Sequence, residues 1–311
     1  MRVPILSARA GWHTDQLCRA LAERGHDGVV LPYERLVARL GTSTAGIGVR
    51  RGAGPGDLRC ADEALDAGVV LARIIPKGSL EQIVFRLDVL HWLEDRGVRV
   101  MNAARAIERT VDKFYTSALL QSSGLPTPET VVCEGADEAM AAVDAMGDVV
   151  IKPLFGSMGH GLVRVSDPDV AFRVLKSLDA IHAVFYVQRV VEHGGRDIRV
   201  FVIGGRVLAA IERQAVQGDW RANVSRGAAA VPCVLPDEWA ALACRAALAV
   251  GADYAGVDLL PAPDGVFVNE VNGIPGWQGL QRATGVDVAG AITDHLLSLA
   301  GTPVVAGSRA E

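Results

Sequence analysis

The sequence is poor in cysteine, and its five cysteines lie far apart. Cys18, Cys60, Cys133, Cys233 and Cys244 form no Cys-x-x-Cys pair and no cysteine–histidine cluster. A structural zinc site requires closely spaced thiolates and imidazoles, so the spacing argues against one. An odd number of scattered thiols is typical of a reducing compartment. We therefore expect a cytoplasmic protein whose cysteines are packing residues.

Long hydrophobic runs and an excess of basic charge are also absent. No apolar run approaches the ~20 residues that span a bilayer, although 50% of the residues are hydrophobic. The apolar N-terminus is interrupted by Arg9 and His13, which breaks any signal-peptide core. The net charge of −5 argues against a general nucleic-acid-binding protein, because such a protein needs a basic surface to neutralise phosphates. These absences predict a globular protein that binds neither membranes nor nucleic acids.

Lysine is scarce as well. Of the 31 basic residues only four are lysines, namely Lys77, Lys113, Lys152 and Lys176. Lysine carries a compact ammonium on a flexible stem, whereas arginine presents a rigid fork. Because the chain otherwise uses arginine, its few lysines are the first positions at which to look for direct contact with a charged ligand.

The 311 residues are enough for three small lobes around one cleft. Apolar spacing predicts an N-terminal α/β lobe over residues 1–97, in which Ser79 and Gln82 form a helix capping box. A central lobe over 98–185 and a C-terminal lobe over 186–300 follow, and residues 301–311 form a tail. The expected elements of the first lobe are strands at 3–6, 29–31 and 69–73, a helix at 14–23 and a loop-rich connection at 41–60.

The central and C-terminal lobes carry further helices and two hairpins. One hairpin is expected to turn at Gly204–Gly205, where adjacent glycines permit positive φ, and the second turns around 261–265. The other expected elements are helices at 103–123, 136–146, 169–178, 237–250 and 287–299, and strands at 130–133, 148–154, 161–166 and 185–191.

The strongest chemical pattern lies on the second hairpin, in VDLL–PAPDG–VFVNEVN. Glu270 and Asn272 are two apart in a strand, so their side chains share one face, and Asp258 lies on the partner strand. Two carboxylates and an amide oxygen suit a hard cation such as Mg²⁺ that bridges phosphates. The alternative is a solvated polar face, against which the apolar flanking residues argue.

A second pattern is VVIKPLFGSMGHG, in which a buried strand ends at Lys152 and a glycine-rich turn follows. Such a loop can bind phosphates through backbone N–H groups, with Ser157 adding a hydroxyl, or it is an ordinary turn. It is neither a Walker A loop nor a Rossmann fingerprint. The glycines expected to form this flap are Gly156, Gly159 and Gly161.

Six motifs in order resemble the ATP-grasp ligases, and most closely their RimK-like branch. They are TVDKFYTSALLQSSGLPTP, VVIKPLFGSMGHG, GRDIRVFVIGGRVLAAIER, RANVSRGA, AGVDLL and VNEVNGIPGWQGL, and the similarity covers about residues 69–299. The resemblance implies an α/β (α+β) ATP-grasp fold. In that fold a small N-terminal α/β lobe accompanies two lobes that grip ATP between antiparallel sheets.

The resemblance also implies roles for individual residues. Two lysines hold the phosphates, the backbone of 188–191 contacts the adenine edge, and the hairpin carboxylates hold one or two Mg²⁺ or Mn²⁺ ions. An acidic residue is usual in the family where Arg189 stands, and we do not assign His160 as a catalytic base. The implied ATP-binding residues are Lys113, Lys152, Gly156, Ser157, Gly159, Gly161, Gln188, Arg189, Val190, Val191, Asp197, Arg213, Arg221 and Asn223. The implied catalytic residues are Arg199, Arg213 and Arg221, and the implied metal ligands are Asp258, Glu270 and Asn272. The implied substrate-binding residues are Arg73, Lys77, Arg226 and Gly276.

The function implied by the resemblance is an ATP- and Mg²⁺-dependent carboxylate–amine ligase that forms an amide through an acyl-phosphate. We expect it to add L-glutamate to a small coenzyme such as a tetrahydromethanopterin-like one-carbon carrier, as a homo-oligomer. Arg73 and Lys77 favour an acidic or phosphorylated acceptor, unless Lys77 is only an exposed loop lysine. The alternatives are glutamate addition to a peptide or ribosomal protein tail, and an ATP-binding module without catalysis.

Overall fold

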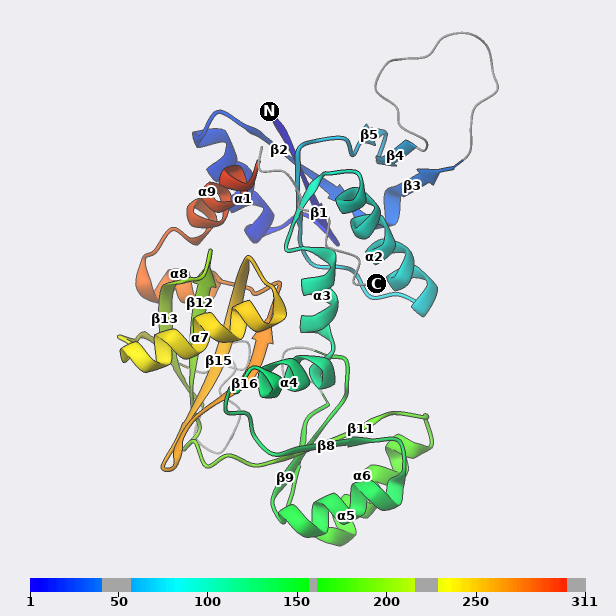
Figure 1. The fold of residues 1–311 in the computed structure, drawn as a ribbon, viewed down its shortest axis with the longest axis vertical. Coiled ribbons are helices and arrows are strands. Elements are labelled where there is room, and N and C mark those ends of the chain that lie inside the picture. The colour runs from blue at the N-terminus through cyan, green and yellow to red at the C-terminus, as the bar shows by residue number, and fades with distance from the viewer. Residues whose placement is uncertain (41–56, 157–160, 216–228, 301–311) are drawn as a thin grey trace. The chain divides into compact units, whose positions relative to one another are not determined.

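The computed structural model describes residues 1–40, 57–156, 161–215 and 229–300. The chain divides into two compact units, Met1–Arg105 with Asp287–Glu311 (unit 1) and Ala106–Val286 (unit 2) (Figure 1). The three-lobe division expected from the sequence stays a prediction beside this one. None of the helices within the described ranges is long and apolar enough to cross a membrane.

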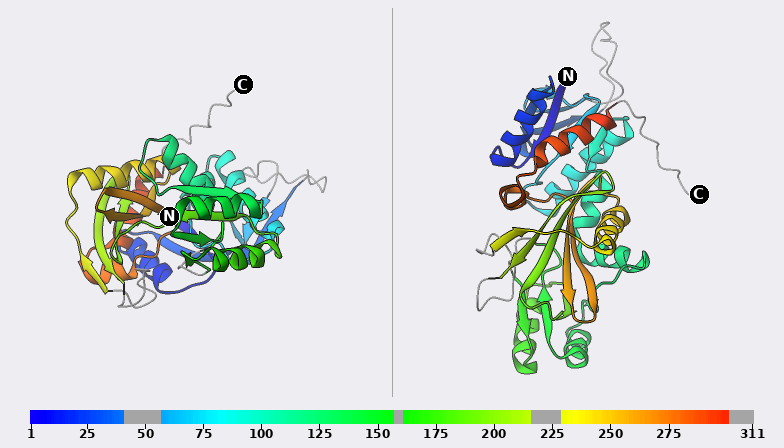
Figure 2. Two further views of the ribbon diagram at one scale, coloured as in Figure 1. Left: turned by 90° about the horizontal axis from the view of Figure 1, so that it is seen from below. Right: turned by 90° about the vertical axis from the view of Figure 1, so that its left-hand side faces the viewer.

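Unit 1 is built on a parallel sheet with the strand order β2-β1-β6-β7. Its central strands are almost fully apolar and buried, as expected for a parallel sheet covered on both faces. Helices α1 and α9 lie side by side in this unit (Figures 1 and 2). The elements are β1 (Arg2–Ser7), α1 (Trp12–Glu23), β2 (Asp27–Pro32), β6 (Val69–Ala72), α2 (Leu80–Asp95), β7 (Arg99–Met101) and α9 (Val288–Leu299).

The predicted capping box at the start of α2 is confirmed. The backbone N–H of Gln82 donates to Ser79 Oγ at 3.3 Å, and the backbone N–H of Ser79 donates to Gln82 Oε1 at 3.0 Å. Two N–H groups that would otherwise lack a helical partner are thereby satisfied.

The loop-rich connection predicted over 41–60 contains a strand at its C-terminal end, which the sequence did not predict. Asp57–Cys60 forms strand β4, which pairs with β3 (Leu36–Arg39) and β5 (Glu63–Ala64) in a small antiparallel sheet, and a single 3₁₀ turn, Tyr33–Arg35, precedes β3. Leu58 and Cys60 are buried whereas Asp57 and Arg59 are half-buried, so the strand follows the period-2 pattern of one packed face. The rest of the expected loop, 41–56, lies outside the described residues.

The single long helix predicted over 103–123 is also wrong. The structure has α3 (Ala104–Val111) and α4 (Lys113–Ser122), which are separated at Asp112. Asp112 has an extended backbone (φ −88°, ψ 106°), and its side chain accepts a hydrogen bond from the N–H of Tyr115. The aspartate therefore acts as an N-cap that starts a second helix, and Lys113 becomes its first residue.

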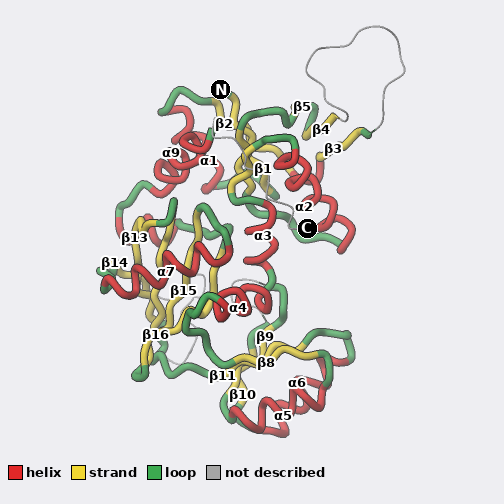
Figure 3. Tube along the Cα trace, in the orientation of Figure 1, coloured by secondary structure: helices red, strands yellow, loops and turns green. Residues whose placement is uncertain are grey.

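The first sheet of unit 2 is antiparallel, with the order β10-β9-β11-β8. Helices α5 and α6 lie together on one side of it (Figures 1 and 3). A cluster of buried apolar side chains, including Val143, Leu175 and Phe185, joins both helices to the sheet. The elements are β8 (Thr130–Cys133), α5 (Ala136–Met146), β9 (Val149–Lys152), β10 (Val163–Val165), α6 (Pro168–Asp179) and β11 (Phe185–Arg189).

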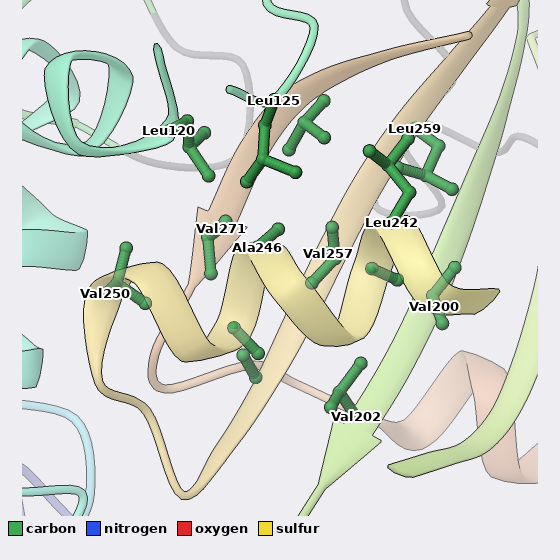
Figure 4. Close-up of a cluster of buried hydrophobic side chains, with 14 of the residues drawn as sticks. Leu120, Leu125, Val200, Val202, Leu242, Ala246, Val250, Val257, Leu259 and Val271 are labelled. Atoms are coloured by element: carbon green, nitrogen blue, oxygen red, sulfur yellow. The ribbon is translucent and has the colours of Figure 1, made fainter. Parts of the chain in front are cut away.

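The second sheet of unit 2 has five antiparallel strands in the order β14-β13-β12-β15-β16. Both predicted hairpins, β12–β13 and β15–β16, are confirmed. Helix α7 packs its alanine-rich face on this sheet around Val200, Val257 and Val271 (Figure 4). The elements are β12 (Arg196–Ile203), β13 (Arg206–Gln214), β14 (Ala229–Pro232), α7 (Asp237–Val250), β15 (Tyr254–Ala262), β16 (Gly265–Asn272) and α8 (Gln278–Thr284), of which β14 and α8 were not predicted.

Candidate functional site

The residues predicted to hold a metal ion are cross-strand neighbours on the last hairpin. Asp258 of β15 pairs directly with Glu270 of β16, and Gly256 pairs with Asn272. Directly opposed residues in an antiparallel pair have Cβ atoms roughly 5 Å apart on the same face. The hairpin therefore brings two carboxylates and an amide together, as the sequence pattern predicts.

Two arginines surround the carboxylate of Asp258, which is only 5% exposed. Arg199 on β12 donates from Nε to Oδ1 and from Nη2 to Oδ2, the second bond at 2.8 Å. Arg213 on β13 lies 3.1 Å from Oδ1 and also donates to both oxygens of Asp197, at 2.5 and 2.7 Å. Because Asp197 and Arg199 are two residues apart on the central strand, all four side chains share one face of the sheet.

The charges of this network balance one another in a buried environment. Burial raises the pKa of Asp258, but the effects of Arg199 and Arg213 are together larger and hold it below the usual range. Burial raises the pKa of Asp197, and the charge of Asp258 adds to this while Arg213 opposes it. Removal of one partner would leave a buried charge uncompensated, which costs about 3–5 kcal/mol in such pairs.

The oxygens of the hairpin fit a divalent cation. Asp258 Oδ1 accepts from both arginines, but among the described residues Oδ2 accepts only from Arg199, which leaves one of its lone pairs for a cation. Asn272 Oδ1 accepts a hydrogen bond from the N–H of Ile274 at 3.0 Å. Glu270 is half-buried and forms no ion pair with any residue that the structure describes. These are the hard oxygen donors that Mg²⁺ prefers, with phosphate oxygens of a ligand completing its shell.

The charge of Glu270 acts on two of the four lysines, Lys152 and Lys113. Lys152, the last residue of β9, is 9% exposed. Burial lowers its pKa to about 8, with Lys113 acting in the same direction and Glu270 opposing. Lys113 donates to the carbonyls of Leu154 at 3.2 Å and Gly156 at 2.9 Å, and burial lowers its pKa against the effect of Glu270. Unit 2 therefore presents two desolvated ammonium groups and a carboxylate pair, a combination suited to a metal-bound polyphosphate.

The comparisons with known proteins agree with this geometry. Residues 110–296, more than half of the chain, match the model of the RimK-like ATP-grasp domain. The chain belongs to the RimK-like ATP-grasp family. The predicted ATP-grasp fold is confirmed, and the protein is an ATP-grasp ligase.

Curated relatives of this ATP-grasp ligase match between three quarters and nearly all of its length. The tetrahydromethanopterin:alpha-L-glutamate ligase of Methanosarcina acetivorans is 36% identical over 75% of this chain and 81% of its own. The protein of the same name from Methanococcus maripaludis is 33% identical over 96% of this chain and 99% of its own. The probable alpha-L-glutamate ligase of Trichodesmium erythraeum is 34% identical over 95% and 96% of the two chains.

Solved ATP-grasp structures share its fold. The RimK domain ATP-grasp protein of Sphaerobacter thermophilus is 25% identical, with a TM-score of 0.68 over 96% of this chain and all of the other. The ligase PsnB, complexed with a minimal precursor, has a TM-score of 0.74 at 22% identity over 95% of this chain and 98% of its own. PsnB has also been solved with Mg and ADP.

Several predicted positions of the ligase fall outside the described residues, so their roles stay predictions. They are Ser157, Gly159, Arg221, Asn223 and Arg226.

In the segment predicted to contact adenine, residues 188–191, several hydrogen-bonding groups already have partners within the protein. The side chain of Arg189 pairs with Glu129 at 2.6 Å and donates to the carbonyl of Met146 at 2.8 Å, so it lies on the protein surface. The N–H of Val190 donates to the carbonyl of Asp148, and the carbonyl of Val191 accepts from the N–H of His193. Adenine contacts from Val190 would therefore use its carbonyl.

The positions predicted to bind substrate lie in both units. Arg73, which follows β6 in unit 1, is 2% exposed, and Lys77 is exposed on the connection to α2. In unit 2, Gly276 is exposed beside the fully buried Trp277. Lys77 and Gly276 are thus exposed whereas the side chain of Arg73 is buried, and the roles predicted for the three residues stay predictions.

Asn269 is a polar neighbour of the site that sequence reasoning missed. In the β15–β16 pairing Asp258 faces Glu270 whereas Leu259 faces Val268, so Asn269 is the extra residue of a β-bulge. The bulge turns its side chain toward Lys152, whose Nζ donates to Asn269 Oδ1 at 3.3 Å. A strict period of two would place Asn269 and Glu270 on opposite faces, so the sequence pattern gave no signal for this contact.

Gly256 provides the space that Arg199 occupies. A Cβ added there would lie 2.8 Å from Arg199 Nη1 and 3.0 Å from Pro275 Cβ. We expect Gly256→Ala to displace Arg199 from Asp258 and to lower kcat by about 10- to 100-fold, with only a small change in the thermal midpoint. Rates of ADP release and thermal melts measure both quantities. Gly68→Ala, whose added Cβ meets nothing within 4 Å, is the matched control, and equal rates for both variants would contradict the assignment.

Proposed function

We propose that this protein adds L-glutamate to a carboxylate of a small pterin-like coenzyme, with ATP and Mg²⁺ as cosubstrate and cofactor. The observation that carries the proposal is the match at 33% identity over 96% of this chain and 99% of a tetrahydromethanopterin:alpha-L-glutamate ligase. The match therefore includes unit 1 as well as the ATP-grasp domain over 110–296. The proposed site residues supply the chemistry that such a reaction needs.

A carboxylate is a poor electrophile, so it first takes the γ-phosphoryl group of ATP and becomes an acyl-phosphate. Mg²⁺, as two ions in the proposed site, would neutralise charge on the transferring phosphoryl oxygens. Asp258, Glu270 and Asn272 would hold these ions through oxygen ligands. Lys113 and Lys152 bind the phosphates, and the guanidinium groups of the arginine positions stabilise the developing charge. The proposed arginines are Arg199, Arg213 and Arg221.

The second step is attack by the glutamate amine on the acyl carbon, which forms the amide and releases phosphate. No nucleophilic side chain is required, because positioning and charge stabilisation accelerate both steps. The sheet carries Arg199 and Arg213 on adjacent strands, each already held by a carboxylate. The ligase therefore holds these donors in place before the substrates arrive, which lowers the reorganisation needed in the transition state.

The topology of unit 1 supports an anionic acceptor. Ligands of open α/β sheets bind beyond the carboxyl ends of the strands where the strand order reverses. In the order β2-β1-β6-β7 that point lies between β1 and β6, and Arg73 directly follows β6, with Lys77 four residues further on. Lys77 is exposed, and a positive side chain at this edge suits the phosphate or carboxylate groups of a coenzyme, whereas the buried Arg73 would add to the positive potential of the edge.

We further propose a cytoplasmic homo-oligomer that acts on small molecules rather than on nucleic acids or membranes. Five free thiols support a reducing compartment. Helix α2 buries one face but leaves the apolar side chains of Leu80, Val84 and Phe85 exposed at 79%, 45% and 41%, which supports contact with a second subunit.

The proposal is tested by incubating the protein with Mg-ATP, L-glutamate and tetrahydromethanopterin, followed by mass spectrometry. The expected result is a coenzyme heavier by one glutamyl unit, formed together with ADP and phosphate. A metabolite extract and a synthetic peptide with a glutamate tail serve as parallel acceptors. Glutamylation of the peptide, with the coenzyme unchanged, would overturn the proposed acceptor.

Lys152 makes nucleotide binding dependent on pH. Its pKa in the free protein is about 8, so the lysine is charged at neutral pH and loses its proton as the pH rises through that value. We expect the Kd for a nonhydrolysable Mg-ATP analogue to be constant below pH 7 and to rise up to ~10-fold per unit above about pH 8. Isothermal titration calorimetry at each pH measures this Kd. Lys152→Arg keeps its charge and should give a flat profile; a flat profile in the wild-type protein would contradict the assignment.

A further inference from the structure

The ammonium group of Lys152 is surrounded by neutral oxygens. Nζ donates to Gln188 Oε1 at 2.6 Å and to Asn269 Oδ1 at 3.3 Å, and it lies 5.8 Å from the centre of the Tyr186 ring. No carboxylate forms an ion pair with it in the part of the chain that the structure describes. An ammonium has three N–H donors, of which the described residues take two, so the third can serve a ligand.

The amide of Gln188, which is 4% exposed, has only one possible orientation. Lys152 is a donor without acceptor capacity, so the amide oxygen must face it and the amide nitrogen must point the other way. Gln188 Nε2 in turn donates to Thr130 Oγ1 at 3.0 Å and lies 3.3 Å from Tyr186 Oη. Oγ1 of Thr130 donates its own proton to the carbonyl of Pro128 at 2.8 Å. These hydrogen bonds form a row that runs from the carbonyl of Pro128 through Thr130 and Gln188 to Lys152, and the direction of each bond is defined.

The row begins at a backbone carbonyl and ends at the lysine, so it fixes where the ammonium lies. Thr130 and Gln188 come from adjacent strands, since Thr130 of β8 pairs with Gln188 of β11 in the sheet register. A glutamate at 188 could hold the lysine equally close, but it would neutralise the charge that a phosphate needs. The neutral amide orients Lys152 without neutralising its charge, on which Glu270 acts without forming an ion pair.

We propose that the side chains of Thr130 and Gln188 are positioning residues, which aim a charged, un-neutralised Lys152 at the phosphates of the nucleotide. The inference rests on the proposed binding of ATP in unit 2 and assigns to the Gln188 side chain a role separate from any backbone contact with adenine. The two residues act through Lys152 and do not contact the reacting atoms.

Calorimetric titration with Mg²⁺ and a nonhydrolysable ATP analogue, over about pH 6.5 to 9.5, tests the proposal. Thr130→Val removes the nearer of the two acceptors of Gln188 Nε2 and leaves Tyr186 Oη, so it should raise the Kd by roughly 10-fold, whereas Thr130→Ser should restore the Kd to within about 2-fold. Gln188→Glu should weaken binding near neutral pH and move the alkaline loss of affinity to higher pH, because the lysine becomes part of an ion pair. Thr293→Val, which removes a buried hydroxyl bonded to Ala289 in unit 1, is the matched control and should bind as wild type.

Two failures can be distinguished in this experiment. If the wild-type protein does not bind the analogue, the proposed function itself fails. If the wild type binds but Thr130→Val and Gln188→Glu show the wild-type Kd and pH profile, while thermal melts show all variants folded, the positioning role is overturned.

Discussion

Replacement of Glu270 by glutamine is expected to lower kcat by at least about 100-fold while the thermal midpoint stays close to that of the wild type. Glu270 lies opposite Asp258 and has no ion-pair partner among the described residues, so the fold does not depend on its charge. Glutamine keeps the shape of the side chain and removes the negative charge that a divalent ion needs. ADP release measures turnover, and Mn²⁺ binding with a nonhydrolysable ATP analogue should weaken in parallel.

Glu212→Gln is the matched control for this variant. Glu212 also lies on the five-stranded sheet, on β13, where its Oε2 forms an ion pair with Arg196 Nη1 at 3.6 Å. Because Glu212 is next to Arg213 in the strand, its side chain points to the face opposite the proposed metal ligands. Its turnover should remain near that of the wild type. Wild-type turnover in Glu270→Gln would contradict the metal assignment. Asp258→Asn should also lower turnover by orders of magnitude, but it is a less clean test because it removes the carboxylate that compensates the buried Arg213 and the half-buried Arg199.

Replacement of Arg199 by lysine should lower kcat by about 100- to 1000-fold with little change in the KM for ATP. Arg199 grips both oxygens of Asp258, a geometry that the single ammonium of lysine cannot reproduce. Lysine conserves the charge, so a loss of turnover would report the position of the guanidinium rather than the net charge of the site. Steady-state kinetics of ADP release separate kcat from KM.

The bidentate ion pair between Arg24 and Asp294 in unit 1 provides the control for this substitution. Arg24 donates from Nε and Nη2 to the two carboxylate oxygens at 2.5 and 2.9 Å, but the pair is partly exposed and lies outside the proposed site. Arg24→Lys should therefore turn over at the wild-type rate. If Arg199→Lys behaves in the same way, Arg199 does not stabilise the transition state.

The hairpins that form the site could be predicted from the sequence because their signals are local. Gly204–Gly205 permits the positive φ values of 54° and 74° that the first turn requires. In the second hairpin, Glu270 and Asn272 are two residues apart on β16, so a period of two predicts that they share a face, and the turn around 261–265 brings Asp258 opposite Glu270.

Other features depend on side-chain contacts that a pattern does not specify. Asp112 divides a continuous amphipathic stretch because its carboxylate caps α4, a choice that a run of helical residues does not indicate. The bulge at Asn269 breaks the period of two, and β4 becomes a strand only by pairing with β3 and β5. The row from Thr130 through Gln188 to Lys152 joins residues far apart in the sequence, so only the fold brings it together.

Transfer of ¹⁸O tests the proposed ligation most directly. The acceptor coenzyme is labelled with ¹⁸O in its terminal carboxylate and incubated with the protein, Mg-ATP and L-glutamate, and the released phosphate is analysed by mass spectrometry. If the carboxylate is activated as an acyl-phosphate at the Asp258–Glu270 hairpin, one labelled oxygen appears in inorganic phosphate for each amide formed, and Glu270→Gln shows almost none. Unlabelled phosphate, or label in AMP, would contradict the account.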